Sequence, residues 1–318
     1  MRSSPSARRA GRRRAAAAVE ACRALPLSDA VRFIANCRVR NHNPPHPPAR
    51  SCRAPASRSD SPPVPRPVTA DTILETRALT KEFKGFVAVR DVNLKVRRGT
   101  IHALIGPNGA GKTTCFNLLT HFLTPSRGQI FFNGDDITGS RPAAIARMGL
   151  VRSFQISAVF PHLTALENVR IALQRKRGNS YDFWRSRASL AAFDARAHEL
   201  LDAVGLTGFA TALAVELPYG RKRALEIATT LALDPELLLL DEPTAGMAHD
   251  DVERIAALIK RVAADRTVLM VEHNLSVVST LSDNITVLAR GEVLAEGDYA
   301  SVSRHPAVVE AYLGASNG

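Results

Sequence analysis

The segment Gly106–Thr114 places the strongest constraint on what this chain can fold into. It reads Gly-Pro-Asn-Gly-Ala-Gly-Lys-Thr-Thr, follows the apolar run Ile101–Ile105 and leads into a helical stretch, Thr113–Leu119. In this context glycines let successive backbone N–H groups point at phosphate oxygens, and the helix N-terminus adds a positive dipole end. A turn that only connects a strand to a helix would not require lysine and threonine at this spacing. We therefore interpret the segment as a phosphate-binding loop.

Within this loop, Lys112 is expected to supply a point charge for the β- and γ-phosphates, and the Thr113 hydroxyl to ligate Mg²⁺. The sequence therefore predicts ATP and Mg²⁺ as cofactors. The loop residues predicted to contact the nucleotide are Gly106, Asn108, Gly109, Gly111, Lys112, Thr113 and Thr114.

An acidic pair, Asp241-Glu242, follows the apolar run Leu237–Leu240. The run indicates a buried strand, and the carboxyl end of such a strand is where α/β sheets hold ligands. Asp241 is expected to reach Mg²⁺, directly or through water, and Glu242 to polarise the attacking water. Taken alone, an acidic pair after a strand is usually a solvated turn. The phosphate loop favours the catalytic interpretation.

The body of the chain predicts a mixed α/β fold. Short alternating stretches over Val87–Val96 indicate antiparallel strands, whereas Thr267–Glu272 is typical of a buried parallel strand that ends at His273. Apolar residues recur at helical spacing over Leu190–Val204 and Val252–Val262. Strands at both ends of the body, with helices concentrated between them, predict an α/β core that carries a helical insertion.

The first 70 residues differ from the rest in composition. They hold fourteen Arg, no Lys and eleven of the nineteen Pro against three acidic residues, and so carry +11 of the net charge of +12. Regular structure is not expected in such a segment. We therefore predict a disordered tail over 1–70 and one domain over 71–318, with the helical insertion at about 156–233.

Two interpretations of the tail stay open. A basic arm would bind anionic lipid or nucleic acid with strong salt dependence. Alternatively, residues 1–67 are not translated and synthesis starts at Val68, because no methionine lies between Met1 and Met148, and Met148 lies beyond the phosphate loop. We favour the later start. Intact-mass measurement distinguishes the two, since a mass that matches all 318 residues would contradict it.

The positions of the cysteines and the hydropathy of the chain limit the cellular compartments in which it is expected to work. Only Cys115 lies in the body, so the body cannot form an internal disulfide and fits a reducing compartment. No apolar run approaches the roughly 20 residues that span a bilayer, so any membrane role is expected to work through a partner.

The chain resembles the ATP-binding subunits of ABC transporters over Thr72–Gly314, about three quarters of its length. The motifs that carry the resemblance occur in the family's order: the phosphate loop, Gln155, Leu217–Arg221, Asp241-Glu242 and His273. The resemblance implies the ABC ATPase fold, in which a P-loop NTPase (RecA-like) core carries an antiparallel β subdomain and a helical insertion. More narrowly, the chain is similar to the ATPases of branched-chain (hydrophobic) amino-acid importers. The stretches that carry this likeness are Arg147–Gln155, Ala224–Ala228, Asp241–Gly246 and Glu310–Gly314.

The resemblance also implies roles for residues that have no specificity alone. Phe83 matches the aromatic position that stacks on adenine, although ordinary core packing is the competing interpretation. Gln155 would contact Mg²⁺ and the attacking water, and His273 the γ-phosphate; a lone His at a strand end is more often a packed residue. The signature Leu217–Arg221, with Leu217 and Gly220 as contacts, would cap the nucleotide of a second ATPase subunit. ATP would then close a head-to-tail dimer.

Two departures from the family pattern stand out. Pro218, Tyr219 and Arg221 replace serine, glycine and glutamine of the usual Leu-Ser-Gly-Gly-Gln signature, so only Gly220 keeps a free backbone approach. The loop after Glu242 usually ends in aspartate, and this chain has Ala248. Because two copies of such a signature would make two imperfect ATP sites, a heterodimer with a related ATPase is expected.

The predicted function is ATP hydrolysis that powers an ABC importer for branched-chain or other hydrophobic amino acids. The expected partners are integral-membrane permease subunits, a second ATPase subunit and, indirectly, a periplasmic solute-binding protein; no nucleic-acid partner is expected. The subunit would lie peripherally on the cytoplasmic face of the inner membrane, where Ile156–His162, including Phe160, forms part of a groove for a short helix of a membrane subunit. Two alternatives remain: the ATPase of a lipid or lipopolysaccharide extractor, and a soluble ABC protein that acts on nucleic acid.

Overall fold

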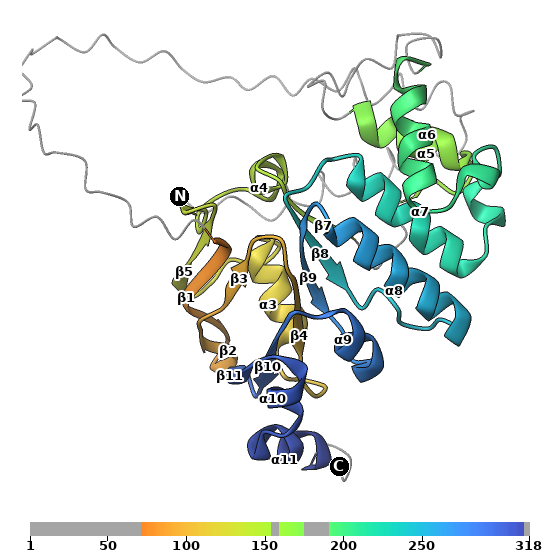
Figure 1. Ribbon diagram of the computed structural model, residues 1–318. Helices are drawn as coiled ribbons and strands as arrows, with labels where there is room; N and C mark the ends of the chain where they lie inside the picture. Colours follow the sequence, from red (N-terminus) through yellow and green to blue (C-terminus); the bar gives the residue numbers. More distant parts are fainter. Residues whose placement is uncertain (1–70, 154–158, 175–190, 315–318) are drawn as a thin grey trace, which may run out of the picture. The chain divides into compact units, whose positions relative to one another are not determined.

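The computed structural model describes residues 71–153, 159–174 and 191–314 (Figure 1). The described residues all belong to one unit of the chain, Arg66–Gly318. The predictions that lie outside the described residues concern the tail 1–70, Gln155 and the first part of the expected groove at 156–158.

Buried apolar runs build a six-stranded sheet of order β11-β10-β4-β9-β8-β7. β4 (Ile101–Ile105), β8 (Leu237–Asp241) and β9 (Thr267–Val271) are buried at every position, as expected of central parallel strands covered on both faces. β11 closes one edge by antiparallel pairing with β10, and β7 lies at the other edge, parallel to β8. The bounds of these outer strands are β7 Leu150–Ser153, β10 Asn284–Ala289 and β11 Glu292–Gly297.

A second, antiparallel sheet precedes and follows β4 in the chain. Its order is β2-β1-β5-β6, and β3 also pairs with β1. The expected antiparallel strands of this region are therefore present. Their bounds are β1 Thr72–Phe83, β2 Phe86–Val92, β3 Lys95–Arg97, β5 Arg127–Phe132 and β6 Asp135–Asp136.

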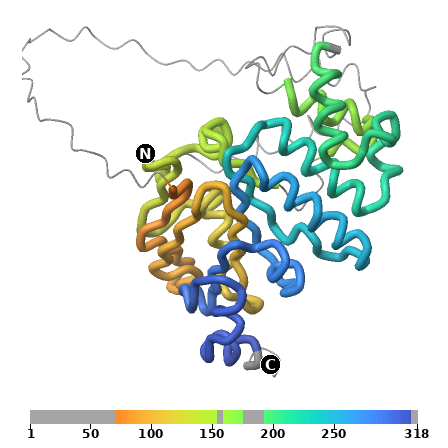
Figure 2. The backbone as a smooth tube through the Cα atoms, viewed as in Figure 1, coloured from red at the N-terminus to blue at the C-terminus, as the bar shows by residue number. Residues whose placement is uncertain are grey.

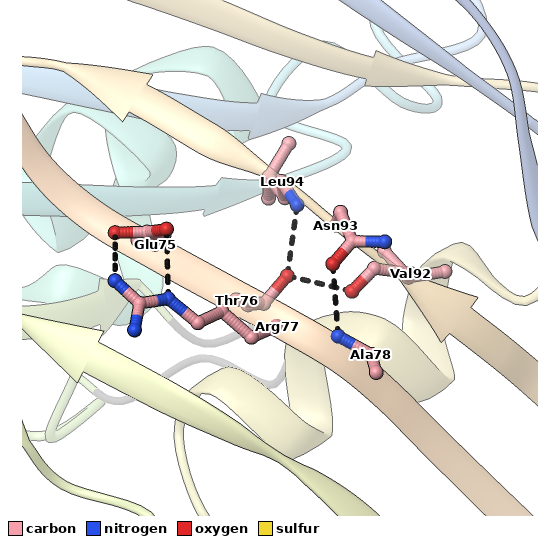
Figure 3. Close-up of polar contacts among 7 residues, drawn as sticks. All are labelled: Glu75, Thr76, Arg77, Ala78, Val92, Asn93 and Leu94. Atoms are coloured by element: carbon pink, nitrogen blue, oxygen red, sulfur yellow. Dashed lines mark hydrogen bonds and ion pairs between the residues drawn. The ribbon is translucent and has the colours of Figure 1, made fainter.

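Side chains fill the gap in this sheet where β1 exchanges its partner β2 for β3 (Figure 3). The Thr76 hydroxyl, almost fully buried, donates to the Val92 carbonyl and accepts from the Leu94 N–H, each at 2.9 Å. The Asn93 side-chain carbonyl accepts from the Ala78 N–H at 2.9 Å. These side chains thus give hydrogen-bond partners to backbone groups of Val92, Leu94 and Ala78 where the ladder is interrupted.

The helical insertion lies between two neighbouring strands of the six-stranded sheet. The chain leaves the sheet at β7, forms α5 (Ala165–Gln174), α6 (Asp194–Ala203) and α7 (Tyr219–Leu231), and returns as β8 beside β7 (Figure 2). β7 and β8 therefore pair directly although the whole insertion separates them in the chain.

The six-stranded sheet separates two apolar cores. In β8, Leu237 packs in one core with α3 (Lys112–Leu119) and the antiparallel sheet, whereas Leu238 packs in the other with the helical insertion and α8 (His249–Ala263). This alternation follows from the period of two along a strand. The remaining helices are α4 Pro142–Arg147, α9 Leu275–Leu281, α10 Tyr299–Ser303 and α11 Pro306–Gly314.

Three element boundaries differ by one residue from the sequence-based expectation, and β8 is one of them, because it ends at Asp241 rather than Leu240. α3 begins at Lys112 rather than Thr113, and β9 ends at Val271 rather than Glu272. Glu272 leaves the strand because its carboxylate binds backbone N–H groups on both sides of the strand tip. Over the described ranges, no helix has the length and apolar content needed to cross a membrane.

Candidate nucleotide-binding and hydrolysis site

Two glycines of the phosphate loop lie where no side chain fits. Gly106 follows β4 with φ 149°, and a Cβ there would lie 2.1 Å from the Leu288 carbonyl oxygen of β10. Gly111 has φ 98°, and its Cβ would lie 2.6 Å from the Ala88 carbonyl oxygen of β2. The loop is therefore held closely between strands of the two sheets, a position that glycine alone permits.

Lys112 begins α3 directly after the loop and is mostly buried. Its Nζ donates to the carbonyl oxygens of Gly106 at 2.7 Å and Pro107 at 2.9 Å, so the ammonium folds back over the loop. Burial lowers the pKa of Lys112, while the charges of Glu242 and Asp241 act in the opposite direction. The first N–H groups of α3 have no partner within the helix, as at any helix start, and can meet an anion.

The acidic pair lies at the carboxyl end of β8, as the sequence predicts. Asp241 is the last residue of the strand and is 1% exposed, and Glu242 follows in a left-handed conformation with φ 45°. The Glu242 N–H donates to the Val271 carbonyl of β9 at 2.9 Å, which fixes the peptide at this turn. Strained backbone of this kind is typical of functional sites. The structure thus brings Asp241 and Glu242 within electrostatic reach of Lys112.

Two arginines that the sequence analysis did not single out hold Asp241. Arg152 of β7 forms an ion pair with its carboxylate and donates to Asn117 Oδ1 at 2.7 Å. Arg223 of α7 donates to the Asp241 carbonyl at 3.1 Å and pairs with Glu226 at 2.7 Å. The one sequence signal for Arg152 is an arginine that follows the apolar pair Leu150-Val151 in a short strand. Arg223 sits among the apolar residues of a buried helix face.

The backbone of His273 is held by Glu272, a second buried carboxylate, which the sequence analysis did not single out. Glu272 is 0% exposed, and its Oε1 accepts from the Thr244 N–H at 3.0 Å and the Thr244 hydroxyl at 2.5 Å. Its Oε2 accepts from the N–H groups of His273 at 3.0 Å and Asn274 at 3.2 Å. His273 itself is exposed. Glu272 therefore fastens the loop after Glu242 to the segment that presents His273.

Phe83 ends β1 and is 41% exposed, so it is not a core residue. It pairs across the hairpin with Phe86, which is 68% exposed, and the Lys81 ammonium lies 5.1 Å from its ring centre. Two residues after Phe86 in β2, the Ala88 carbonyl oxygen lies against Gly111 of the phosphate loop. The exposed aromatic hairpin is thus joined directly to the strand that borders the phosphate loop.

The signature lies at the start of α7, with Pro218 as its N-cap. Leu217 is 4% exposed, and its N–H donates to the Ala214 carbonyl at 3.4 Å. The expectation that Gly220 keeps a free backbone approach is wrong for this conformation. Gly220 is buried, and the Asp251 carboxyl lies 2.7 Å from where its Cβ would be. Arg221 lies 3.6 Å above the Phe209 ring, which engages its guanidinium within the same subunit.

The comparisons with known proteins agree with this geometry. The family model for ABC transporters matches residues 89–245, and that for branched-chain amino acid ATP-binding cassette transporters matches residues 292–316. The chain is 40% identical over 250 residues to the high-affinity branched-chain amino acid transport ATP-binding protein BraF of Pseudomonas aeruginosa, covering 76% of this chain and 98% of that protein. The chain belongs to the ABC transporter ATPase family.

Two further relatives support the same placement. LivG of Escherichia coli K12, a high-affinity branched-chain amino acid transport ATP-binding protein, is 38% identical over 250 residues, which are 76% of this chain and 98% of LivG. A crystal structure of the ADP conformation of an ATP-binding cassette of an ABC transporter superposes with a TM-score of 0.67 and 30% identity, covering 76% of this chain and 99% of that one. As a family member, this chain is an ATP-binding, ATP-hydrolysing enzyme with the ABC ATPase fold.

The oxygen donors of this ABC ATPase suit a nucleotide-bound Mg²⁺. Within the described residues, no group of three or more His, Cys, Asp or Glu side chains could hold a metal ion. Mg²⁺ does not require such a cage, because it is commonly bound by one or two oxygen ligands together with substrate phosphates and water. The Asp241 carboxylate and the hydroxyl of exposed Thr113, the residue after Lys112, are ligands of this kind.

An apolar groove of about 430 Å³ lies on the ATPase beside β7. Phe160, which is 51% exposed, and Phe122 contribute aromatic walls, and Arg152 forms part of the lining. Buried Asn168 of α5 fixes the Phe160 backbone, accepting from its N–H at 2.7 Å and donating to its carbonyl at 3.1 Å. Phe160, in the described part of the segment 156–162, thus lines a groove.

The C-terminal segment of the ABC ATPase adjoins the phosphate loop. A cavity of about 870 Å³ is bounded on one side by Asn108 and Gly109 and on the other by Glu310 and Ala311 of α11. Burial raises the pKa of the Tyr312 hydroxyl, and the Gly106 backbone acts in the opposite direction. The segment that marks the branched-chain subgroup therefore lies against the nucleotide loop.

Proposed function

We propose that this ABC ATPase powers an importer of branched-chain or other hydrophobic amino acids. The match of residues 292–316 to the branched-chain cassette model carries the proposal, because this segment lies outside the motifs that all ABC ATPases share. The likeness to BraF and LivG extends over the whole cassette and supports the same solute class.

In the proposed reaction the residues of the site divide into those that bind the nucleotide, those that bind Mg²⁺ and those that activate water. Lys112 and the N–H groups of the loop bind the phosphates, and Phe83 stacks on adenine. Asp241 and Thr113, together with Gln155, would hold Mg²⁺, which neutralises phosphate charge when bound. Glu242 polarises the attacking water, and His273, fastened through Glu272, contacts the γ-phosphate. Glu242 activates only a water that lies next to the γ-phosphate. Hydrolysis therefore requires the tip of β8 and the phosphate loop to be in place together.

The proposed partners are integral-membrane permease subunits, one of which places a short helix in the groove lined by Phe160 and Phe122. Exposed aromatic side chains in an apolar groove favour the apolar face of such a helix. The subunit would then lie on the cytoplasmic face of the inner membrane, with a periplasmic solute-binding protein on the other side.

We also infer that ATP joins this chain to a different ATPase subunit. Pro218 has no hydroxyl for the γ-phosphate, and the Arg221 side chain is engaged by Phe209. A lost hydrogen bond to a charged group costs about 1.5–3 kcal/mol. A heterodimer needs to tolerate this loss at one of its two ATP sites, whereas a homodimer carries it at both.

Substitution of the two charged site residues tests the hydrolytic assignment. Glu242→Gln in the assembled transporter should still bind ATP but turn over at least about a hundredfold more slowly, the scale of a lost general base. Lys112→Ala should bind nucleotide poorly. Glu236→Gln is the matched control, because Glu236 is a half-exposed carboxylate at the opposite end of β8, paired with Arg98. Near wild-type turnover by Glu242→Gln would sink the assignment.

The solute is tested separately in vesicles that contain the assembled transporter and its solute-binding protein. ATP-dependent accumulation of radiolabelled leucine, isoleucine or valine is the expected result. ATP turnover that responds to lipopolysaccharide or lipid and not to these amino acids would instead favour the extractor.

A further inference from the structure

Arg152 contacts parts of the ATPase that lie far apart in the sequence. It lies in β7, at the edge of the six-stranded sheet, and its side chain is 11% exposed. One guanidinium nitrogen pairs with Asp241, and the other donates to Asn117 of α3 at 2.7 Å. The guanidinium also lies 5.8 Å from the centre of the Phe116 ring. The guanidinium therefore connects β7 with both β8 and α3.

The contact with Asp241 places a positive charge where Mg²⁺ is proposed to bind. Asp241 is 1% exposed, and its Oδ2 is the oxygen that Arg152 contacts. A guanidinium and a divalent cation cannot share one carboxylate oxygen without strong repulsion. Asn117 adds a second connection, because it lies on the helix that starts with Lys112 and Thr113. Arg152 therefore opposes metal binding as long as it stays paired with Asp241.

Arg152 also borders the apolar groove beside β7. Arg152 lines the apolar groove together with Phe160, Ile145 and Thr230. Its Nε is buried and has no hydrogen-bond partner within the described residues, so this N–H is free to donate to a new acceptor. The residue is thus placed to respond to whatever occupies the groove.

We propose that Arg152 is a positioning residue that couples occupancy of the groove to metal binding at Asp241. With the groove empty, Arg152 pairs with Asp241 and weakens Mg²⁺ binding. When a permease helix fills the groove, Arg152 turns toward it and frees the carboxylate. ATP hydrolysis by the free subunit is thereby restrained until the transporter is assembled. The proposal rests on the groove being the docking site of the proposed function.

Metal affinity, rather than activity, is the readout of the test. Mn²⁺, a spectroscopic stand-in for Mg²⁺, is titrated by electron paramagnetic resonance against protein saturated with a non-hydrolysable ATP analogue. The wild-type free subunit should bind Mn²⁺ about tenfold more weakly than the assembled transporter, the scale of one charged hydrogen bond. Arg152→Gln should raise the affinity of the free subunit to the assembled value and close the difference. Arg147→Gln, an exposed arginine on α4 beside the groove, should leave the difference unchanged.

Each outcome separates this proposal from the proposed function. Equal Mn²⁺ affinities of the wild-type free subunit and the assembled transporter would overturn the coupling, even if Arg152→Gln does not fold. An unchanged affinity of folded, free Arg152→Gln would overturn the competition at Asp241. Failure of the wild-type chain to form a complex with permease subunits would instead contradict the docking site, and the comparison of free subunits would still stand.

Discussion

Single buried charges, more than the exposed ones, set the geometry of the active site. Glu272 accepts four hydrogen bonds from three residues, and these bonds connect the strand tip of β9 to the loop after Glu242. A carboxylate that is 0% exposed is stable only when its oxygens are satisfied in this way. Replacing Glu272 would therefore release His273 and Thr244 together, so the two segments act as one unit.

A buried histidine in β4 predicts a pH dependence of stability. His102 in β4 is 0% exposed, its Nε2 lies 2.8 Å from Thr286 Oγ1, and burial lowers its pKa from 6.5 to about 4. Between these values the unfolded chain binds a proton that the folded chain does not. The free energy of unfolding therefore falls as the pH drops from 6.5 toward 4.

His102→Gln keeps a polar partner for Thr286 and removes the titration. Urea unfolding at about pH 7.5 and about pH 5 should show that wild type loses about 2 kcal/mol more than the variant. Equal losses in the two proteins would mean that His102 does not carry the effect.

At the level of elements, the sequence predicts strands and helices that are defined by their own residues. The apolar runs of β4, β8 and β9 and the periodic α8 need no information from elsewhere in the chain. α4 is only six residues long, and β11 is half-exposed at a sheet edge, so their patterns are too short or too mixed to predict. The ion pair of Arg152 with Asp241 is hidden for another reason. It exists only because β7 pairs with β8 across the whole helical insertion.

The contact between α7 and α8 predicts an unusual tolerance at the signature. Alanine at Gly220 would bring its Cβ 2.7 Å from the Asp251 side chain, whose carboxyl can rotate away at the cost of an exposed pair with Arg254. Alanine also gains helix propensity of about 0.8–1.0 kcal/mol over glycine. Gly220→Ala should therefore unfold in urea within about 1 kcal/mol of wild type.

Asp251→Ala tests the cause. The double variant Gly220→Ala, Asp251→Ala should be more stable than the sum of the single variants, because the crowding disappears. A large destabilisation by Gly220→Ala that Asp251→Ala does not relieve would place the constraint in the backbone instead.

For the whole molecule, the proposed heterodimer predicts the subunit composition of the transporter. A transporter purified with its membrane subunits should contain one copy of this chain and one copy of a related ATPase, because two signatures with Pro218 would weaken both ATP sites. Native mass spectrometry of the intact complex measures this directly. Two copies of this chain, without a second ATPase, would refute the heterodimer.

The buried thiol of Cys115 reports how often the helix that follows the phosphate loop opens. It lies in α3, three residues after Lys112, at 0% exposure, and burial raises the pKa of its thiol to about 12. A thiol that is neither ionised nor accessible is alkylated only during moments when α3 separates from the sheet. The alkylation rate of the peptide that contains Cys115, resolved by mass from those of Cys22, Cys37 and Cys52, therefore counts these openings. Because bound nucleotide contacts the start of the same helix, ATP should lower the alkylation rate of Cys115. The ratio of the rates without and with ATP measures how much the nucleotide suppresses opening of α3.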